Sequence, residues 1–242
     1  EFSVCSSDLM KPNPKYVSYY YETMTDWPDL IVDPKKTALL IVDMQKEFIS
    51  REIGESITFR ETGEWERWLP FHDRLDDIVI PNNVKLLNYF RDKGLLVTFG
   101  RIACLRPDGE DREPVQKTEG WNGIFLYVHT EEAEMIDELK PLPEEIVVNK
   151  TTDSVVAGTN YTRLIRNLGV ETVVVTGIVT DQCVAGTVRG LADEGFQVIC
   201  VEDACAAACM EHHDAELKIM NKLYCEVLST EQTIDVLEGK LK

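Results

Sequence analysis

Apolar and β-branched residues form short continuous runs at six places along the chain. The first run, Thr37–Asp43 (TALLIVD), ends in an acid. The later runs are Leu95–Phe99, Glu145–Val148, Thr172–Val175, Gln197–Val201 and Cys225–Leu228. Uninterrupted apolar runs of this length are typical of strands that are buried on both faces, and such strands belong to parallel sheets. The pattern therefore predicts six strands in one mostly parallel sheet.

Segments with helical periodicity separate these runs. The expected helices are Asn82–Lys93, Tyr161–Leu168, Val184–Glu194 and Glu211–Leu223. A glycine follows three of the four, as in DKGLLV, NLGVETVVV and DEGFQVICV, and glycine commonly ends a helix. Strands that alternate with helices predict a three-layer α/β/α fold with a doubly wound, Rossmann-like sheet. No shift in composition marks a second domain, so we expect one domain over residues 1–242.

Two segments do not follow the alternation. Residues 1–35 form an irregular arm whose aromatic residues Tyr19–Tyr21 and Trp27 favour packing on the protein over a flexible leader. Residues 49–80 separate the first strand from its helix, and loops longer than ~12–15 residues are usually lids, binding loops or disordered segments. Three aromatic residues favour a folded, lid-like excursion that closes over a ligand or forms a dimer contact: Trp65, Trp68 and Phe71.

Composition narrows the class of protein. The 25 Lys and Arg residues against 43 Asp and Glu residues give a net charge of −18, which disfavours nucleic acid and anionic membranes as partners. No apolar run approaches the ~20 residues that span a bilayer. The seven cysteines are odd in number and scattered without a C-x-x-C pair, unlike a disulfide-stapled secreted domain. Since no signal peptide is visible, a cytoplasmic location is expected.

Three reactive residues lie where predicted strands end. Asp43 ends the first strand, Lys150 follows the third, and Cys183 begins the helix after the fourth. Because ligands of open parallel sheets bind beyond the carboxyl ends of the strands, we expect the three side chains to meet at one edge.

The three residue types suit nucleophilic catalysis. A thiol must become a thiolate to attack a carbonyl, and a helix N-terminus together with Lys150 is expected to lower the pKa of Cys183. Asp43 can accept the thiol proton and return it to a leaving amine. Each residue also has a structural interpretation, because cysteines are often simply buried, a strand-terminal Asp often caps a turn and a lysine is usually solvated. Their joint placement favours catalysis.

Three segments, in order, resemble the isochorismatase-like cysteine hydrolases, a superfamily that includes nicotinamidases, N-carbamoylsarcosine amidase and ureidoacrylate-type amidohydrolases. They are LLIVDMQKEF (residues 39–48), VVNKTTDSVVAGTNYTRLIRNLGV (147–170) and VTGIVTDQCVAGTVRGLADEGFQVICVEDACAA (175–207). The resemblance covers about residues 37–230.

The resemblance implies Cys183 as the nucleophile, Asp43 as the general base and acid, and Lys150 as the positive group that supports both. It also implies a non-proline cis peptide at Ile178–Val179, which turns the Val179 N–H toward an oxyanion hole shared with the Cys183 N–H. A homo-oligomer, either a dimer or a tetramer, is implied as well. The stretch FGRIACLRPDGEDRE lacks the histidine that metal-binding nicotinamidases carry there, so no metal and no cofactor is expected, and nicotinamide is disfavoured as the substrate.

Further residues are candidates for contact with a small-molecule substrate. Arg101, Arg106 and Arg112 follow the second strand and could anchor a carboxylate, or pair with the acids of their own loop. Gln45 and Phe48 lie just past Asp43 and could line the pocket, although Phe48 could equally belong to the core. Thr151, Thr152 and Asp153 could bind substrate, but capping of a turn is the preferred interpretation. Cys104 is expected to be a bystander, and His212 and His213 are expected at the surface or at the start of a helix.

The sequence thus predicts a cysteine amidohydrolase that cleaves a C–N bond of a small linear amide, ureide or N-carbamoyl compound through a thioester, releasing ammonia or an amine. Two alternatives remain at this point. One is isochorismatase-type cleavage of a vinyl ether, which needs Asp43 but not Cys183. The other is a catalytically silent binding or scaffolding subunit, which the intact set of three residues disfavours.

Overall fold

Six parallel strands form the centre of the molecule in a computed structural model that describes residues 13–118 and 124–241. Their order in the sheet is β3-β2-β1-β4-β5-β6, and every neighbouring pair is parallel. The strands are β1 Thr37–Val42, β2 Leu96–Ile102, β3 Ile146–Lys150, β4 Thr172–Ile178, β5 Gln197–Ala206 and β6 Glu226–Leu228. The expected doubly wound α/β/α fold is confirmed, although β2, β4 and β5 run several residues beyond their apolar cores.

The strand order reverses at β1. In the register, Leu40 pairs with Thr98 of β2 on one side and with Val175 of β4 on the other. The chain therefore winds away from β1 in both directions, and the segments that follow β1 and β4 leave the sheet side by side. This is the place where open α/β sheets bind their ligands.

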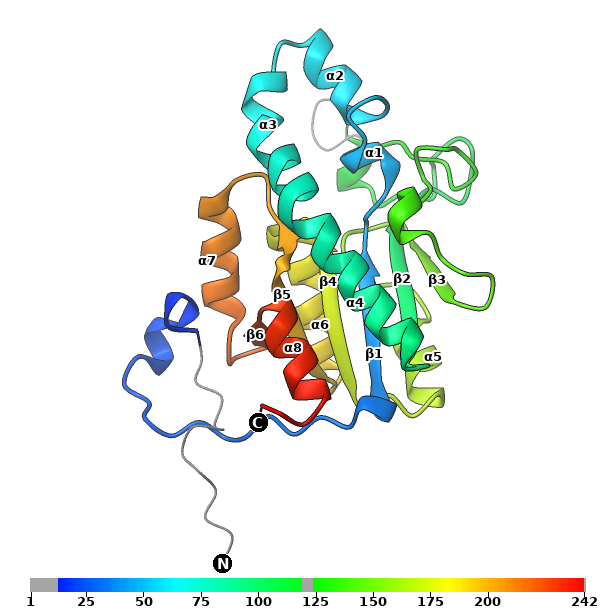
Figure 1. Cartoon of the computed structure of the whole chain (residues 1–242). Helices are drawn as coiled ribbons and strands as arrows, with labels where there is room; N and C mark the ends of the chain where they lie inside the picture. Colours follow the sequence, from blue (N-terminus) through cyan, green and yellow to red (C-terminus); the bar gives the residue numbers. More distant parts are fainter. Residues whose placement is uncertain (1–12, 119–123, 242) are drawn as a thin grey trace, which may run out of the picture.

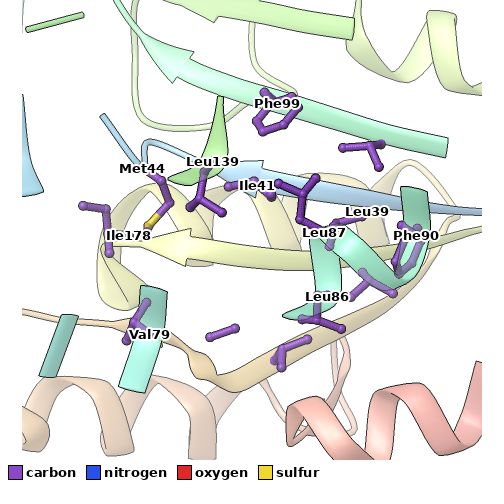
Figure 2. Packing of buried hydrophobic residues seen from close by; sticks show 14 of the residues in the cluster. Leu39, Ile41, Met44, Val79, Leu86, Leu87, Phe90, Phe99, Leu139 and Ile178 are labelled. Atoms are coloured by element: carbon purple, nitrogen blue, oxygen red, sulfur yellow. The ribbon is translucent and has the colours of Figure 1, made fainter. Parts of the chain in front are cut away.

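Helices cover both faces of the sheet (Figure 1). They are α1 Lys46–Ile49, α2 Glu55–Glu61, α3 Trp65–Arg74, α4 Ile80–Asp92, α5 Tyr161–Asn167, α6 Ala185–Asp193, α7 Met210–Met220 and α8 Thr230–Leu237. Leu39 and Ile41 of β1 pack toward α4, among the buried side chains shown in Figure 2, whereas Leu40 belongs to a second buried cluster with residues of α5 and α6. Successive strand residues point to opposite faces, so this strand has to be apolar throughout.

The segment 49–80 is helical and stands above the carboxyl ends of the strands (Figure 1). Helix α3 does not end in a loop before α4. A π-helical turn, Leu75–Val79, joins the two, so the chain is helical without interruption from Trp65 to Asp92. Pro70 and Pro81 lie within this stretch. The expected helix began at Asn82, directly after Pro81, whereas α4 begins at Ile80 and the preceding residues are helical as well.

The arm is anchored by one aromatic side chain. The hydroxyl of Tyr16 is buried and contacts Glu202 Oε2 at 2.9 Å and Asp214 Oδ1 at 3.3 Å. By contrast, Tyr19 and Tyr20 are about four-fifths exposed, so the expected packing of the arm rests on Tyr16 instead of the tyrosine triplet. Residues 1–12 of the arm lie outside the described residues. Among those described, none of the helices has the length and apolar character needed to cross a membrane.

Candidate active site

The structure brings Asp43, Lys150 and Cys183 together at the edge of the sheet. The ammonium Nζ of Lys150 lies 2.7 Å from Asp43 Oδ2 and 3.3 Å from Cys183 Sγ. All three residues are buried, with Cys183 the most accessible at 8%. Lys150 starts from β3, two strands away from β1, and its long side chain passes the end of β2 to reach Asp43. A single ammonium group therefore bridges an acid and a thiol.

Backbone groups at the end of β2 fix the Asp43 carboxyl. Asp43 adopts a φ of 51°, its N–H donates to Gly100 O at 2.8 Å, and its Oδ1 accepts the Ile102 N–H at 2.7 Å. The left-handed conformation turns the side chain back over the neighbouring strand. Because one oxygen is held by β2, the other is left to face Lys150.

The thiol lies on a tight turn after β4. The peptide Ile178–Val179 is cis, as expected, and a π-helical turn, Thr180–Val184, carries Cys183 before α6 begins. Gly177 has a φ of 112°, and a Cβ there would overlap the backbone of Val42, so glycine is required where β4 passes β1. Cys183, expected at the start of this helix, thus lies in the π-helical turn that continues directly into α6.

The electrostatics differ from the expectation of a lowered thiol pKa. Burial raises the pKa of Cys183 well above the usual range of a thiol, and the negative charge of Asp43 adds to this, outweighing Lys150. Burial also raises the pKa of Asp43, against the opposing effect of Lys150. For Lys150, burial lowers the pKa, but the attraction of Asp43 and Cys183 outweighs it, so the net pKa is raised. The ammonium of Lys150 therefore lies between an acid and a thiol whose pKa values are both raised by burial.

A cavity of about 260 Å³ opens onto the thiol. Cys183, Asp43 and Val179 line its floor, with Ile102, Ile178 and Gln182 beside them. The opposite wall comes from segment 49–80 and its neighbours, and its lining side chains are Phe48, Glu55, Phe59, Trp68 and Phe71. Trp68 and Phe71, two of the three aromatic residues for which closure over a ligand and a dimer contact were the alternatives, therefore line the same cavity as the thiol. The third, Trp65, packs beneath Arg60 outside it.

The arginine candidates lie outside the cavity lining. Arg101 is half-buried and donates to Asn149 Oδ1 and Ala133 O, because its place in β2 directs it toward β3. Arg106 is exposed and paired with Asp108, two residues on in the same turn. Arg112 is buried and bonded to Gln116. The interpretation as ordinary local pairing fits Arg106, whereas the buried Nε and Nη1 atoms of Arg112 have no hydrogen-bond partner among the described residues.

Two further candidates also point elsewhere. Gln45 is fully buried, and its amide exchanges hydrogen bonds with the backbone of Ile102 and Ala133, so it fixes the loop instead of lining the pocket. Thr151 lies outside the lining, and its carbonyl accepts the Glu113 N–H at 3.3 Å. Asp153, for which a turn cap was preferred, lines the cavity instead, with its Oδ1 3.8 Å from Cys183 Sγ. Phe48, for which pocket and core were the alternatives, lines the cavity and also packs against the core.

His213 lies in the first turn of α7, which was one of the two expectations for it, but it is not at the surface. Its ring is fully buried, with Nδ1 2.8 Å from Thr180 Oγ1 and Nε2 3.3 Å from an Arg74 nitrogen. Arg74 also donates to the carbonyls of Glu202 and Cys205, and thereby ties α3 to the end of β5. His212, by contrast, is exposed as expected. No local signal in the sequence distinguished the two histidines. The contact of His213 with Arg74 joins residues that are more than a hundred positions apart.

Over residues 13–118 and 124–241, no group of three or more His, Cys, Asp or Glu side chains could hold a metal ion. What the arrangement can do is set by its groups: a thiol, an acid that can exchange a proton with it, a fixed positive charge and a partly apolar cavity.

Comparison with known proteins identifies the family. Residues 37–232 match the isochorismatase domain, and the chain belongs to the isochorismatase family of hydrolases. It is 25% identical over 213 residues to the uncharacterized isochorismatase family protein YrdC of Bacillus subtilis (strain 168), covering 83% of this chain and 96% of that one. It is 28% identical over 185 residues to the ureidoacrylate amidohydrolase RutB of Pantoea ananatis (strain LMG 20103), covering 71% and 69%.

Solved structures agree with this assignment. N-carbamoylsarcosine amidase from Thermoplasma acidophilum superposes with a TM-score of 0.61 at 26% identity, covering 81% of this chain and 97% of that one. A cysteine hydrolase from Pseudomonas syringae pv. phaseolicola 1448A has a TM-score of 0.73 at 23% identity, covering 89% and 100%, and shows the shared fold.

Proposed function

We propose that this protein is a cysteine amidohydrolase that cleaves the C–N bond of a small linear amide, ureide or N-carbamoyl compound. The observation that carries the proposal is the position of Lys150 Nζ, 2.7 Å from Asp43 Oδ2 and 3.3 Å from Cys183 Sγ, beside a cavity that Asp43 and Cys183 both line. A vinyl-ether cleavage would leave the thiol without a task in this arrangement.

In the first half of the reaction, the Cys183 proton moves to Asp43 as Sγ attacks the substrate carbonyl. The transfer keeps the total charge of the three groups constant, which suits a buried site where a free thiolate is costly. Lys150 stabilises the thiolate as it forms, and the N–H groups of Val179 and Cys183 donate hydrogen bonds to the developing oxyanion. The C–N bond then breaks, and the departing nitrogen takes the proton held by Asp43.

In the second half, water hydrolyses the thioester. Asp43, again ionised, accepts a proton from the attacking water while the new oxyanion occupies the same N–H groups. Collapse releases the acid, and the thiolate recovers the proton from Asp43. Two of the relatives named above are described as amidases of this kind, acting on ureidoacrylate and N-carbamoylsarcosine, and they support the same reaction type here.

The test is ammonia release from a panel of small amides, ureides and N-carbamoyl compounds. We expect Cys183→Ser to lose at least about 100-fold in rate on any substrate that the wild-type protein hydrolyses. Mass spectrometry of a slow substrate should show an acyl adduct on the peptide that contains Cys183. Equal rates for the wild type and Cys183→Ser would contradict a covalent mechanism and leave the vinyl-ether reaction as the better candidate.

A further inference from the structure

The cavity wall that faces the thiol contains an acid that the proposed reaction does not use. Glu55 begins α2, and its carboxylate lines the cavity together with Phe59 of the same helix. Over the described residues, no hydrogen bond or ion pair connects the Glu55 carboxylate to another side chain. Glu55 is half-buried in the lining, and burial raises its pKa to about 7, with a contribution from Glu47.

Aromatic faces surround this acid. Phe59 and Trp68 stack with ring centroids 4.5 Å apart and planes 9° from parallel, and Phe71 meets Trp68 edge-on at 5.7 Å. All three rings line the cavity with Glu55. An acid set among aromatic rings is the environment that binds organic cations, since the ring faces and the carboxylate both attract positive charge.

The charges of the whole lining point the same way. Its ionisable members are Asp43, Glu55, Asp153 and Cys183, and the described lining contains neither Lys nor Arg. The one buried ammonium beside the cavity, Lys150, is already committed to Asp43 and Cys183. A substrate carboxylate would therefore lie near two acids, Glu55 and Asp153, and the described lining contains no Lys or Arg that could pair with it. A substrate cation would find a partner across the cavity from the nucleophile.

The wall is rigidly built. Gly54 precedes α2 with a φ of 70°, and a Cβ there would overlap the backbone of Glu47, so α2 starts in direct contact with α1. The Ser56 hydroxyl donates to Ser50 O at 2.6 Å and lies 3.4 Å from His72 Nε2 of α3. Contacts of this kind hold Glu55 at a fixed place in the lining.

From this geometry we propose that the enzyme selects amides that carry a positively charged amine or guanidine a few bonds from the scissile carbonyl, and that Glu55 is the residue that recognises this charge. The inference rests on the proposed function for the identity of the scissile group, but the charge preference concerns binding alone. Glu55 is a specificity-determining residue, which contacts the substrate and takes no part in the proton transfers.

Three amides of nearly equal size separate the possibilities: 4-aminobutanamide, which is cationic, pentanamide, which is neutral, and succinamate, which is anionic. Their binding to Cys183→Ala is measured by isothermal titration calorimetry at pH 8. We expect 4-aminobutanamide to bind at least 10-fold more tightly than pentanamide and succinamate to bind most weakly. Glu55→Gln should reduce the cation preference to within about threefold and leave pentanamide within twofold. Glu61→Gln, on the exposed end of the same helix, is the matched control and should change nothing.

The affinity for 4-aminobutanamide should also rise about 10-fold from pH 6 to pH 8, because only the ionised fraction of Glu55 binds the cation and its pKa is about 7. The groups that face Glu55 are Glu47 of α1, Asp43 and Cys183 on the cavity floor, and Asp153; from α3 only Trp68 and Phe71 line the cavity. The rise should be absent in Glu55→Gln.

Equal binding of the three amides, preference for succinamate, or no binding of any of them overturns the inference. So does a Glu55→Gln variant that weakens all three amides equally, since this would indicate a structural role. Ammonia release by the wild-type protein is measured in parallel. Selective binding of the cation without hydrolysis of any amide would count against the proposed function alone, whereas hydrolysis without charge selectivity would count against this inference alone.

Discussion

Lys150 and Asp43 come from strands that are not neighbours, and their side chains nevertheless meet at 2.7 Å in a buried ion pair. Removing the ammonium by Lys150→Met leaves Asp43 without its cation, and breaking a buried pair typically costs about 3–5 kcal/mol. We expect loss of activity and a lower free energy of unfolding in urea. The control is Lys85→Met, which removes an exposed ion pair to Glu231 and should cost less than about 1 kcal/mol.

The cost of Lys150→Met should depend on pH. Burial raises the pKa of Asp43, and without the opposing ammonium the folded protein holds a proton that the unfolded chain releases above pH 4. A folded state that binds more protons loses stability as pH rises, so the deficit relative to wild type should be larger at pH 8 than at pH 5. An equal deficit at both values would contradict the burial of an uncompensated carboxyl.

Asp43→Asn separates proton transfer from thiol reactivity. Asparagine cannot carry the proton, so ammonia release should fall by about 100-fold or more. The substitution also removes the negative charge that helps to raise the pKa of Cys183 while Lys150 remains, so alkylation of Cys183 by iodoacetamide should become faster than in wild type. The adduct is quantified on the peptide that contains Cys183, with Cys183→Ser as the blank. Parallel loss of both activities would show that Asp43 acts mainly by holding the site together.

Gly54 offers a test of how the cavity wall is positioned. Gly54→Ala introduces a Cβ that overlaps the Glu47 backbone, in addition to the cost of about 1–2 kcal/mol for an alanine at positive φ. Gly63→Ala is the matched control, because Gly63 has a φ of 78° and nothing within 4 Å of its Cβ position. Both variants should be destabilised in thermal unfolding, but only Gly54→Ala should weaken the binding of 4-aminobutanamide. Equal effects of both on binding would mean that Glu55 is not positioned through this contact.

His213 should make stability sensitive to mild acid. Its pKa is lowered to about 4, chiefly by burial, while the unfolded chain takes up the proton near pH 6.5. The unfolded state therefore gains protons first as pH falls, and stability that is complete above pH 6.5 is lost down to about pH 4. The stability difference between wild type and His213→Gln should shrink by on the order of 2–3 kcal/mol between pH 7.5 and pH 4.5. His212→Gln, at the exposed neighbour, should show no such change.

The sheet and the three central residues were predictable because their signals are local. An apolar run such as Thr37–Val42 identifies a strand buried on both faces, and strand ends of a parallel sheet converge by construction. Asp43, Lys150 and Cys183 could therefore be brought together from their positions alone. The family resemblance added the cis peptide and the roles of these residues, which the strand pattern does not encode.

The cavity wall was not predictable in the same way. Glu55 lies in a segment whose helices have no fixed relation to the strand ends, so nothing in its neighbourhood indicated that it faces Cys183. The arginines after β2 differ from their expected placement for another reason. Their position in the sequence suggested the edge of the sheet where substrates bind, but Arg106, for example, pairs with Asp108 of its own turn. His213 became buried through Arg74, a contact made across most of the chain.

The uninterrupted helix from Trp65 to Asp92 has a consequence for how related enzymes diverge. One end of this helix belongs to the cavity wall and the other to the shared core, whereas the reacting groups come from strand ends elsewhere in the chain. Changes in the segment before Trp65 can therefore alter the cavity wall without moving Asp43, Lys150 or Cys183. The strand-end motifs therefore do not indicate which molecule the cavity holds.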